Sequence, residues 1–136
     1  MIKGGKEGGF LLLAHATTWD RRFQVSSLAA SAAASGVPVD VALFFGALDA
    51  WVRGRWDALD PAPPLDADKL EALDPPQLSR MMDTARETGS LRLYACSASM
   101  RFLGLSAAEV QARVDIIAGW QTFSKLALEA RQVVTL

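Results

Sequence analysis

Cysteine and histidine are nearly absent from this chain of 136 residues, which holds one of each, Cys96 and His15. A single cysteine excludes an intramolecular disulfide, so any redox or sulfur chemistry needs a partner from another molecule. One cysteine and one histidine also exclude zinc sites of the familiar kind, and neither HExxH nor CxxC occurs in the sequence. We therefore predict a protein without a resident metal or cofactor.

An excess of charge and a long apolar run are missing as well. Fourteen lysines and arginines stand against fifteen acidic residues, without the basic stripe that nucleic-acid binding requires. The longest apolar run, residues 41–48, falls far short of the roughly 20 residues that cross a bilayer. With one cysteine and no export signal, we expect a cytoplasmic protein that has neither nucleic acid nor membrane as a partner.

The amino terminus resembles a secretory signal only in part. Residues 1–16 combine lysines, an apolar stretch and a small-x-small triplet, but Glu7 lies in what should be a positive region. The apolar stretch 10–13 is also shorter than the roughly 7 to 15 residues that a signal needs. We interpret this stretch as a buried first strand, preceded by a flexible terminus that contains Gly4, Gly5, Gly8 and Gly9.

What the chain does contain is an alternation of short apolar runs and longer helical patterns, which predicts βαβ units. Most of the runs are continuously apolar, as in strands that helices cover on both faces. The length suits a single domain, 1–136. We expect an α/β fold, a three-layer sandwich whose mainly parallel five-stranded sheet has the flavodoxin-like order 2-1-3-4-5. The predicted strands are 9–14, 39–45, 91–95, 114–117 and 132–136.

Helical spacing of apolar residues predicts a first helix over 21–35, where the opposite side is polar. Further helices are predicted at 47–53, from 74 to about 89, at 97–103 with Gly104 closing the helix, from 106, and from about 119. Asp74 and Pro75 have cap and first-turn chemistry, and Ser106 with Glu109 has capping-box spacing. An exposed, acidic, proline-bearing loop is expected at about 55–74.

Four tryptophans are many for one domain of this size. Trp120 shares a predicted helical face with Phe123, so we expect core packing for it. Trp51 and Trp56 lie near the proline-bearing loop and could instead face a partner subunit, because aromatic residues anchor interfaces.

Three candidate loops follow predicted strands: His15–Asp20, Phe45–Asp49 and Cys96–Arg101. In open α/β sheets, ligands bind beyond the carboxyl ends of the strands, where these loops would meet. Cys96 is the main candidate, because free N–H groups at the start of the next helix and the charge of Arg101 would favour a thiolate. A free cysteine is also commonly an inert core residue, and that alternative stays open.

His15 follows the first strand at the same edge and could act as base or orienting partner for Cys96 if the two strands were neighbours. A surface role is the simpler alternative. Candidate binding residues, for an anion or another small ligand, are Thr17, Thr18, Asp20, Ser97 and Ser99. Thr18 or Asp20 could equally serve as a helix cap.

The segment 91–105, with Tyr94-Ala95-Cys96 followed by a Ser-Met pair and a Gly-Leu step, resembles the DsrE/DsrF-like sulfur-relay family. It is especially similar to the branch labelled DsrE2-like or peroxiredoxin-like, as is the Gly-x-x-Thr-Phe pattern in 114–123. The resemblance extends over 11–46. It implies a compact α/β sandwich that forms homo- or hetero-oligomers, commonly trimers or hexamers, and it matches Cys96 to the cysteine that carries a persulfide. The short acidic insert at 55–74 departs from that branch.

Three functions remain open at this point. In the first, a sulfurtransferase or sulfur carrier, Cys96 accepts sulfane sulfur from a donor and delivers it to an acceptor protein or small thiol. The second is a binding or assembly module that holds an anion, a nucleotide or a partner while Cys96 is merely packed. The third is a thiol peroxidase, which would need an external thiol because Cys96 has no resolving cysteine in the chain.

Overall fold

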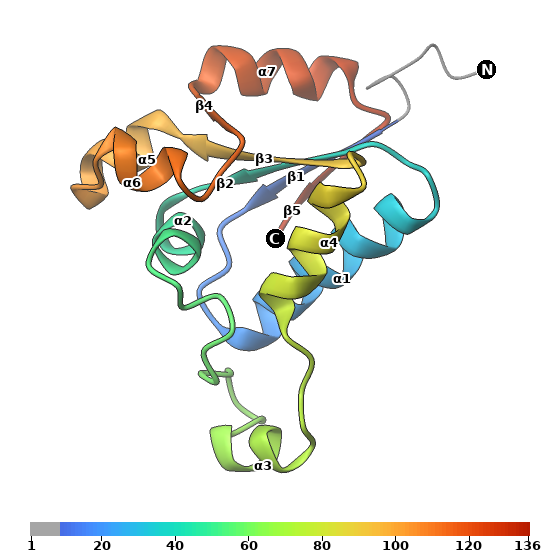
Figure 1. Cartoon of the computed structure of the whole chain (residues 1–136), viewed down its shortest axis with the longest axis vertical. Helices are drawn as coiled ribbons and strands as arrows, with labels where there is room; N and C mark the ends of the chain where they lie inside the picture. The colour runs from blue at the N-terminus through green and yellow to red at the C-terminus, as the bar shows by residue number, and fades with distance from the viewer. Residues whose placement is uncertain (1–8) are drawn as a thin grey trace.

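Five parallel strands form one sheet in the computed structural model, which describes residues 9–136 (Figure 1). Gly4, Gly5 and Gly8 of the predicted flexible terminus lie outside the described residues. The strands are β1 (Phe10–Ala14), β2 (Val39–Leu43), β3 (Leu91–Cys96), β4 (Ile116–Ala118) and β5 (Gln132–Thr135). Each agrees with a predicted run to within two residues, so the α/β class and the parallel five-stranded sheet are confirmed.

The strands lie in the order β4-β3-β2-β1-β5, so the flavodoxin-like sandwich is confirmed but the particular order 2-1-3-4-5 is not. From β1 to β4 the chain steps in one direction, and only the last connection reverses to place β5 beside β1. Right-handed crossovers put helices on one face while the chain steps one way and on the other face after it reverses. The topology therefore leaves one face of the sheet to a single crossover helix.

The helices are α1 (Trp19–Ala34), α2 (Phe45–Val52), α3 (Ala67–Ala72), α4 (Leu78–Glu87), α5 (Ser97–Leu103), α6 (Ala107–Gln111) and α7 (Trp120–Glu129). Helices α1 and α4 lie side by side on one face, and α7 lies alone on the opposite face (Figure 1). Gly104 ends α5 in the left-handed conformation, with φ of 70°, as predicted. Ser106 and Glu109 form the predicted capping box of α6.

The larger core lies on the face of the sheet that carries α1 and α4, and tryptophans are buried in it. Trp51 and Trp56 are each 1% exposed and meet edge to face, with ring centroids 5.5 Å apart. Their indole N–H groups donate to the Arg113 carbonyl and to Ser26 Oγ, at 2.7 and 2.9 Å. Neither ring is therefore at the surface in this structure, and the proposal that they face a partner subunit is wrong for this fold.

Trp120, which the helical spacing placed in the core, is 54% exposed. The buried side of α7 is instead formed by Phe123 and Leu126, three residues apart. Trp120 is the first residue of α7 and lies at the end of the helix that projects past this buried pair. The prediction for Trp120 is therefore wrong, because spacing alone does not say where along a helix the sheet ends.

The segment between α2 and α4 is largely exposed, as predicted for the acidic loop, but buried contacts attach it to α1. The side chain of Arg22, 1% exposed, donates to three backbone carbonyls, including that of Trp56, and to the Asp60 carboxylate at 2.5 Å. The Asp20 carboxylate accepts the Ala62 N–H at 2.7 Å. These bonds hold the first half of the segment against α1.

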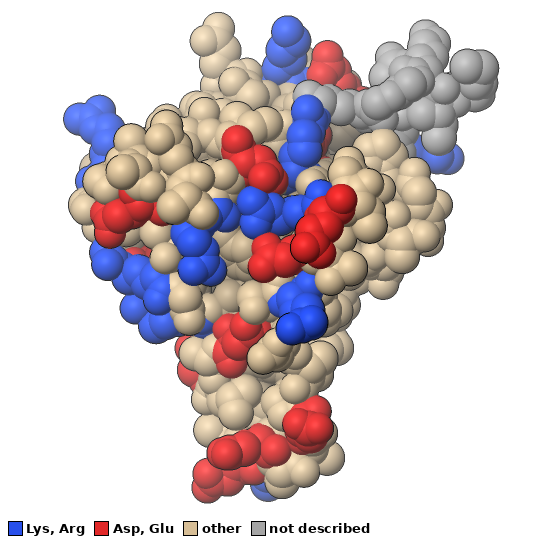
Figure 2. All heavy atoms as spheres, in the orientation of Figure 1, with Lys and Arg blue, Asp and Glu red and all other residues tan. Residues whose placement is uncertain are grey.

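The outer half of this segment contains α3, which the sequence did not predict. The helix buries one residue, Leu70, and Asp66 caps it by accepting the Lys69 N–H at 2.9 Å. Acidic side chains gather at this projecting end of the molecule (Figure 2).

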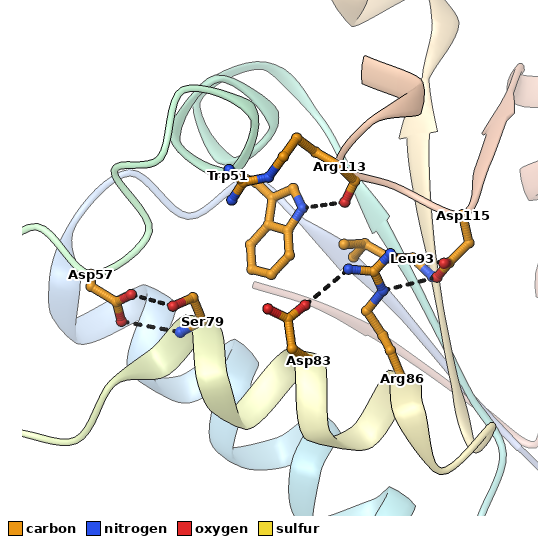
Figure 3. A network of polar contacts seen from close by, with 8 residues as sticks. All are labelled: Trp51, Asp57, Ser79, Asp83, Arg86, Leu93, Arg113 and Asp115. Atoms are coloured by element: carbon orange, nitrogen blue, oxygen red, sulfur yellow. Dashed lines mark hydrogen bonds and ion pairs between the residues drawn. The ribbon is translucent and has the colours of Figure 1, made fainter. Parts of the chain in front are cut away.

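Helix α4 begins at Leu78 rather than at the predicted Asp74. Pro76 disfavours helical backbone at Pro75, and Asp74 itself has a positive φ of 51°. The first turn of α4 is capped from a distance, because the Asp57 carboxylate accepts the Ser79 N–H at 3.0 Å and also binds the Ser79 hydroxyl (Figure 3). A long-range cap of this kind has no local sequence signature.

Candidate functional site

The loops predicted to carry chemistry meet at the carboxyl ends of β1, β2 and β3. The strand register continues into a row across the sheet that contains His15, Phe44 and Cys96, with Ala118 beyond Cys96. The first two loops also approach each other closely, since a Cβ added to Gly46 would lie 2.4 Å from the methyl carbon of Thr17. The predicted meeting of the three loops is therefore confirmed.

Cys96 is the last residue of β3 and the N-cap of α5. Its Sγ accepts the backbone N–H of Ser99, with 3.4 Å between nitrogen and sulfur. An N–H donated at a helix start favours negative charge on the sulfur. Yet Cys96 is 1% exposed and belongs to a small core cluster with Phe44, Tyr94 and Phe123. The thiol therefore combines a contact that suits a thiolate with nearly complete cover.

His15 is exposed and does not contact Cys96, because β2 lies between their strands. The Phe44 ring occupies the intervening position and stacks on the His15 ring, with centroids 4.9 Å apart. Neighbouring strands are about 4.8 Å apart, so two strand spacings, roughly 10 Å, separate the two residues. In this arrangement His15 has no direct route to the thiol proton.

Arg101 is exposed on α5 and lies five residues after Cys96. At about 100° per residue, it is turned roughly 140° around the helix from the N-cap position. Its guanidinium is therefore directed to a different side of α5 from the thiol. The structure does not bring Arg101 to Cys96.

Some residues of the polar turn at the start of α1 already have hydrogen-bond partners within the fold. Asp20 is occupied by the Ala62 N–H, and this bond is the leading cause that holds the pKa of its carboxyl below the ordinary value. Thr17 contacts Gly46 and offers its carbonyl to Arg22. Thr18 is the N-cap of α1, but its side chain makes no capping bond.

Ser97 and Ser99 both lie beside the thiol on α5. Ser99 is fully buried, and among residues 9–136 its Oγ has no hydrogen-bond partner. Ser97 lies next to the start of α7, since its Oγ is 3.6 Å from the position of a Cβ added to Gly119. Ser97 therefore connects the neighbourhood of Cys96 to the start of α7, while Ser99 is buried beside the thiol.

Aromatic side chains dominate this edge, a role that was not predicted from the sequence. Phe44 is 1% exposed and has His15 on one side and Trp120 on the other, each with ring centroids 4.9 Å away. Phe45 and Phe102, 48% and 81% exposed, stack at 6.1 Å. The doublet Phe44-Phe45 at the end of the predicted strand 39–45 was the available signal, because successive residues there must point in different directions.

A second polar cluster lies under α7, toward the amino ends of β2 and β3. Asp40 is 8% exposed, and its Oδ1 accepts from Arg92 Nε at 3.0 Å. Burial raises the pKa of Asp40 to about 6, while a hydrogen bond from Tyr94 acts in the opposite direction. Asp40 and Arg92 also line a hollow of about 330 Å³.

A third polar network joins α4 to the start of β4 (Figure 3). Arg86 binds both oxygens of Asp115, at 2.8 and 3.1 Å, and also pairs with Asp83. Asp115 accepts the backbone N–H of Leu93 at 2.8 Å. Burial raises the pKa of Asp115, but Arg86 and the Leu93 N–H outweigh it and hold the pKa below its ordinary value. The network fastens a short edge strand, which is a structural role.

Over the described part of the chain, no cluster of three or more His, Cys, Asp and Glu side chains is arranged to hold a metal ion. None of the helices in residues 9–136 is long and apolar enough to cross a membrane.

The DsrE/DsrF-like family model matches residues 10–136. Among solved structures, protein MTH1491 of Methanobacterium thermoautotrophicum, a protein of unknown function, has a similar fold, with a TM-score of 0.60 and 12% sequence identity. That likeness covers 96% of this chain and 100% of the other. A comparison with curated proteins finds no match. Because the family model spans the chain from β1 to its last residue, the chain belongs to the DsrE/DsrF-like family.

Proposed function

We propose that this protein is a sulfur-relay carrier in which Cys96 accepts sulfane sulfur as a persulfide and passes it on. The observation that carries the proposal is the place of the thiol at the carboxyl edge of the sheet, as N-cap of α5 with the Ser99 N–H on its sulfur. Membership in the DsrE/DsrF-like family is consistent with a sulfur-relay role. The partners would be donor and acceptor proteins or small thiols in a reducing, cytoplasmic setting.

The transfer is a thiolate exchange that needs no added oxidant. The Cys96 thiolate attacks the terminal sulfur of a donor R–S–SH, the donor S–S bond breaks, and R–S⁻ leaves with the bonding electrons. The product is Cys96–S–SH, which keeps the proton of the transferred SH group. An acceptor thiolate then attacks that outer sulfur and releases the Cys96 thiolate.

Intact mass after incubation of the native protein with a small-molecule persulfide tests the proposal. We expect the mass of one sulfur atom to be added to the wild type and not to Cys96→Ser, and to be removed by excess acceptor thiol. The denatured wild type serves as a control for reagent and thiol. Native protein that gains no sulfur over hours, while the denatured protein does, would contradict the proposal. A parallel incubation with peroxide examines the thiol peroxidase alternative.

The burial of Cys96 favours a second candidate, an oligomeric binding or assembly module in which the thiol is only packed. The exposed rings of Phe45, Phe102 and Trp120 at the same edge would suit contact with another subunit or partner. Trimers or hexamers are the expected assemblies. Light scattering on the wild type and Phe102→Ser tests whether this edge carries the assembly. A module further predicts that Cys96→Ser keeps its partner binding and its cellular function, whereas loss of function in a Cys96→Ser protein that keeps its fold and assembly would contradict the module.

A further inference from the structure

A thiol that is 1% exposed cannot meet a donor unless its cover moves, and the weakest cover is on the α7 face of the sheet. That face is the one left to a single crossover helix by the strand order. We propose that α7 is a gate whose outward movement exposes Cys96, with Phe123 and Leu126 as the latch that holds it closed. The inference rests on the proposed function for its purpose, but the movement itself is independent of sulfur transfer.

Cys96 and the latch belong to one small cluster. Phe123 meets the rings of Phe44 and Tyr94 edge-on, with centroids 5.3 and 6.1 Å away. Phe44 is the neighbour of Cys96 on the next strand, and Tyr94 precedes it by two residues on the same face of the sheet. The Phe123 ring therefore packs against both aromatic neighbours of the thiol, and the small Ala42, in register with Tyr94, belongs to the same cluster.

Few contacts hold α7 in place. Of its ten residues only Phe123 and Leu126 are buried, and the half-exposed Trp120 ring stacks on Phe44, whereas α1 on the other face buries seven of sixteen. Lys125 and Glu129 make no ion pair with any residue in 9–136. Segments with few buried contacts open locally at a lower free energy than the global unfolding of the protein. The helix can therefore lift while the larger core stays intact.

Both ends of α7 suit a hinged movement. The N-cap, Gly119, has extended backbone and no side chain that could cap the helix. Ala130, after the helix, is extended as well. Gly119 directly follows Ala118, the neighbour of Cys96 on β4. A rotation at this glycine would move Phe123 away from the thiol without breaking β4.

The gate is tested with the full chain and an aromatic disulfide reagent, whose thiolate is released when the Cys96 thiolate attacks its S–S bond. We expect Phe123→Ala and Leu126→Ala to raise the rate of reaction about tenfold or more, because the rate follows the population of the open state. Leu128→Ala, at a residue of α7 that is 88% exposed, is the matched surface control and should leave the rate within a factor of two.

Two further variants separate gating from global unfolding. Leu78→Ala removes a fully buried side chain from α4 on the other face, and it should lower the urea midpoint without a comparable rise in thiol rate. Gly119→Ala should slow the reaction about two- to fivefold by restricting the hinge, since an added Cβ meets Ser97 Oγ only at 3.6 Å.

The gate proposal is overturned if Leu78→Ala raises the rate of the thiol reaction as much as Phe123→Ala does. In that case the thiol would react only through global unfolding. The proposal is also overturned if the wild-type thiol reacts as fast as the unfolded chain, or if the latch variants do not change the rate. Because the reagent carries no sulfane sulfur, a protein that passes this test and gains no sulfur from a persulfide would have a gate without the proposed function.

Discussion

The two faces of the sheet differ in how they are held together. The α1 and α4 face is thick, with fully buried tryptophans and an arginine that attaches the adjoining loop by three hydrogen bonds. The α7 face has one helix, two buried anchors and, beneath them, the only cysteine and a buried carboxyl. The larger core is on one side of the sheet, and the cysteine thiol and the buried Asp40 carboxyl are on the other.

The largest effect expected from this contrast comes from two tryptophans. Trp56→Ala should lower the free energy of unfolding by about 3–5 kcal/mol, because it empties a fully packed site and removes the bond to Ser26. Trp120→Ala, at a ring 54% exposed on the α7 face that stacks on Phe44, should cost about 1–2 kcal/mol. Urea unfolding of both variants gives the comparison, and equal costs would mean that the two faces contribute alike.

Arg22 provides the next largest effect. Arg22→Met keeps the volume of the side chain but leaves the carbonyls of Thr17, Trp56 and Ala58 without their donor. We expect a loss of about 3–4 kcal/mol, since hydrogen bonds from a charged group are worth more than neutral ones. Arg21→Met, at the exposed neighbouring residue, is the control. Faster proteolysis of the segment between α2 and α4 in Arg22→Met alone would show that the loop has come loose.

The buried carboxyl of the thin face makes stability depend on pH. Burial raises the pKa of Asp40 from 3.8 to about 6, and the charged or polar groups around it are Arg92, Tyr94 and Glu129. A folded-state pKa above the unfolded one stabilises the fold below pH 3.8, and this contribution is lost as pH rises through 6. The shift corresponds to about 3 kcal/mol.

Asp40→Asn should remove that dependence, so that the variant gains stability relative to the wild type between pH 4 and 7. Urea midpoints of both proteins across this range provide the measurement, and the difference between the two cancels the titration of other groups. Parallel curves would show that the Arg92 ion pair offsets burial and keeps Asp40 ionised throughout.

The strands were predictable because a continuous apolar run, which is typical of a strand covered on both faces, can be seen within a few neighbouring residues of the sequence. The predicted strand order, 2-1-3-4-5, was wrong, because an apolar run such as 39–45 does not reveal which strands will flank it. The observed order decides that Phe44 lies between His15 and Cys96 and that a single helix covers the thiol. The meeting of the three loops was predictable, while the contacts between their side chains were not.

The remaining errors have the same origin in long-range contacts. Asp74 and Pro75 have good local helix-start chemistry, yet α4 is capped by Asp57 from the preceding loop. Trp120 has core spacing, yet it lies at the end of its helix where the buried side has run out. Local patterns therefore identified elements and candidate residues, and the partners of those residues came from the fold.

The smallest expected effect tests whether the α1 and α4 face is stabilised by burial or by ion pairs at its surface. Arg86 connects α4 of that face to Asp115 before β4, but it is partly exposed, as are both of its acidic partners (Figure 3). Arg86→Gln should cost about 1 kcal/mol or less, and added salt should reduce the difference, because exposed ion pairs are weak and screened. Arg80→Gln, at an exposed position of the same helix, is the control in the same urea experiment. A loss near that of Trp56→Ala would show instead that the Asp115 bond to the Leu93 N–H depends on Arg86, and that the edge strand contributes as much to the fold as the core.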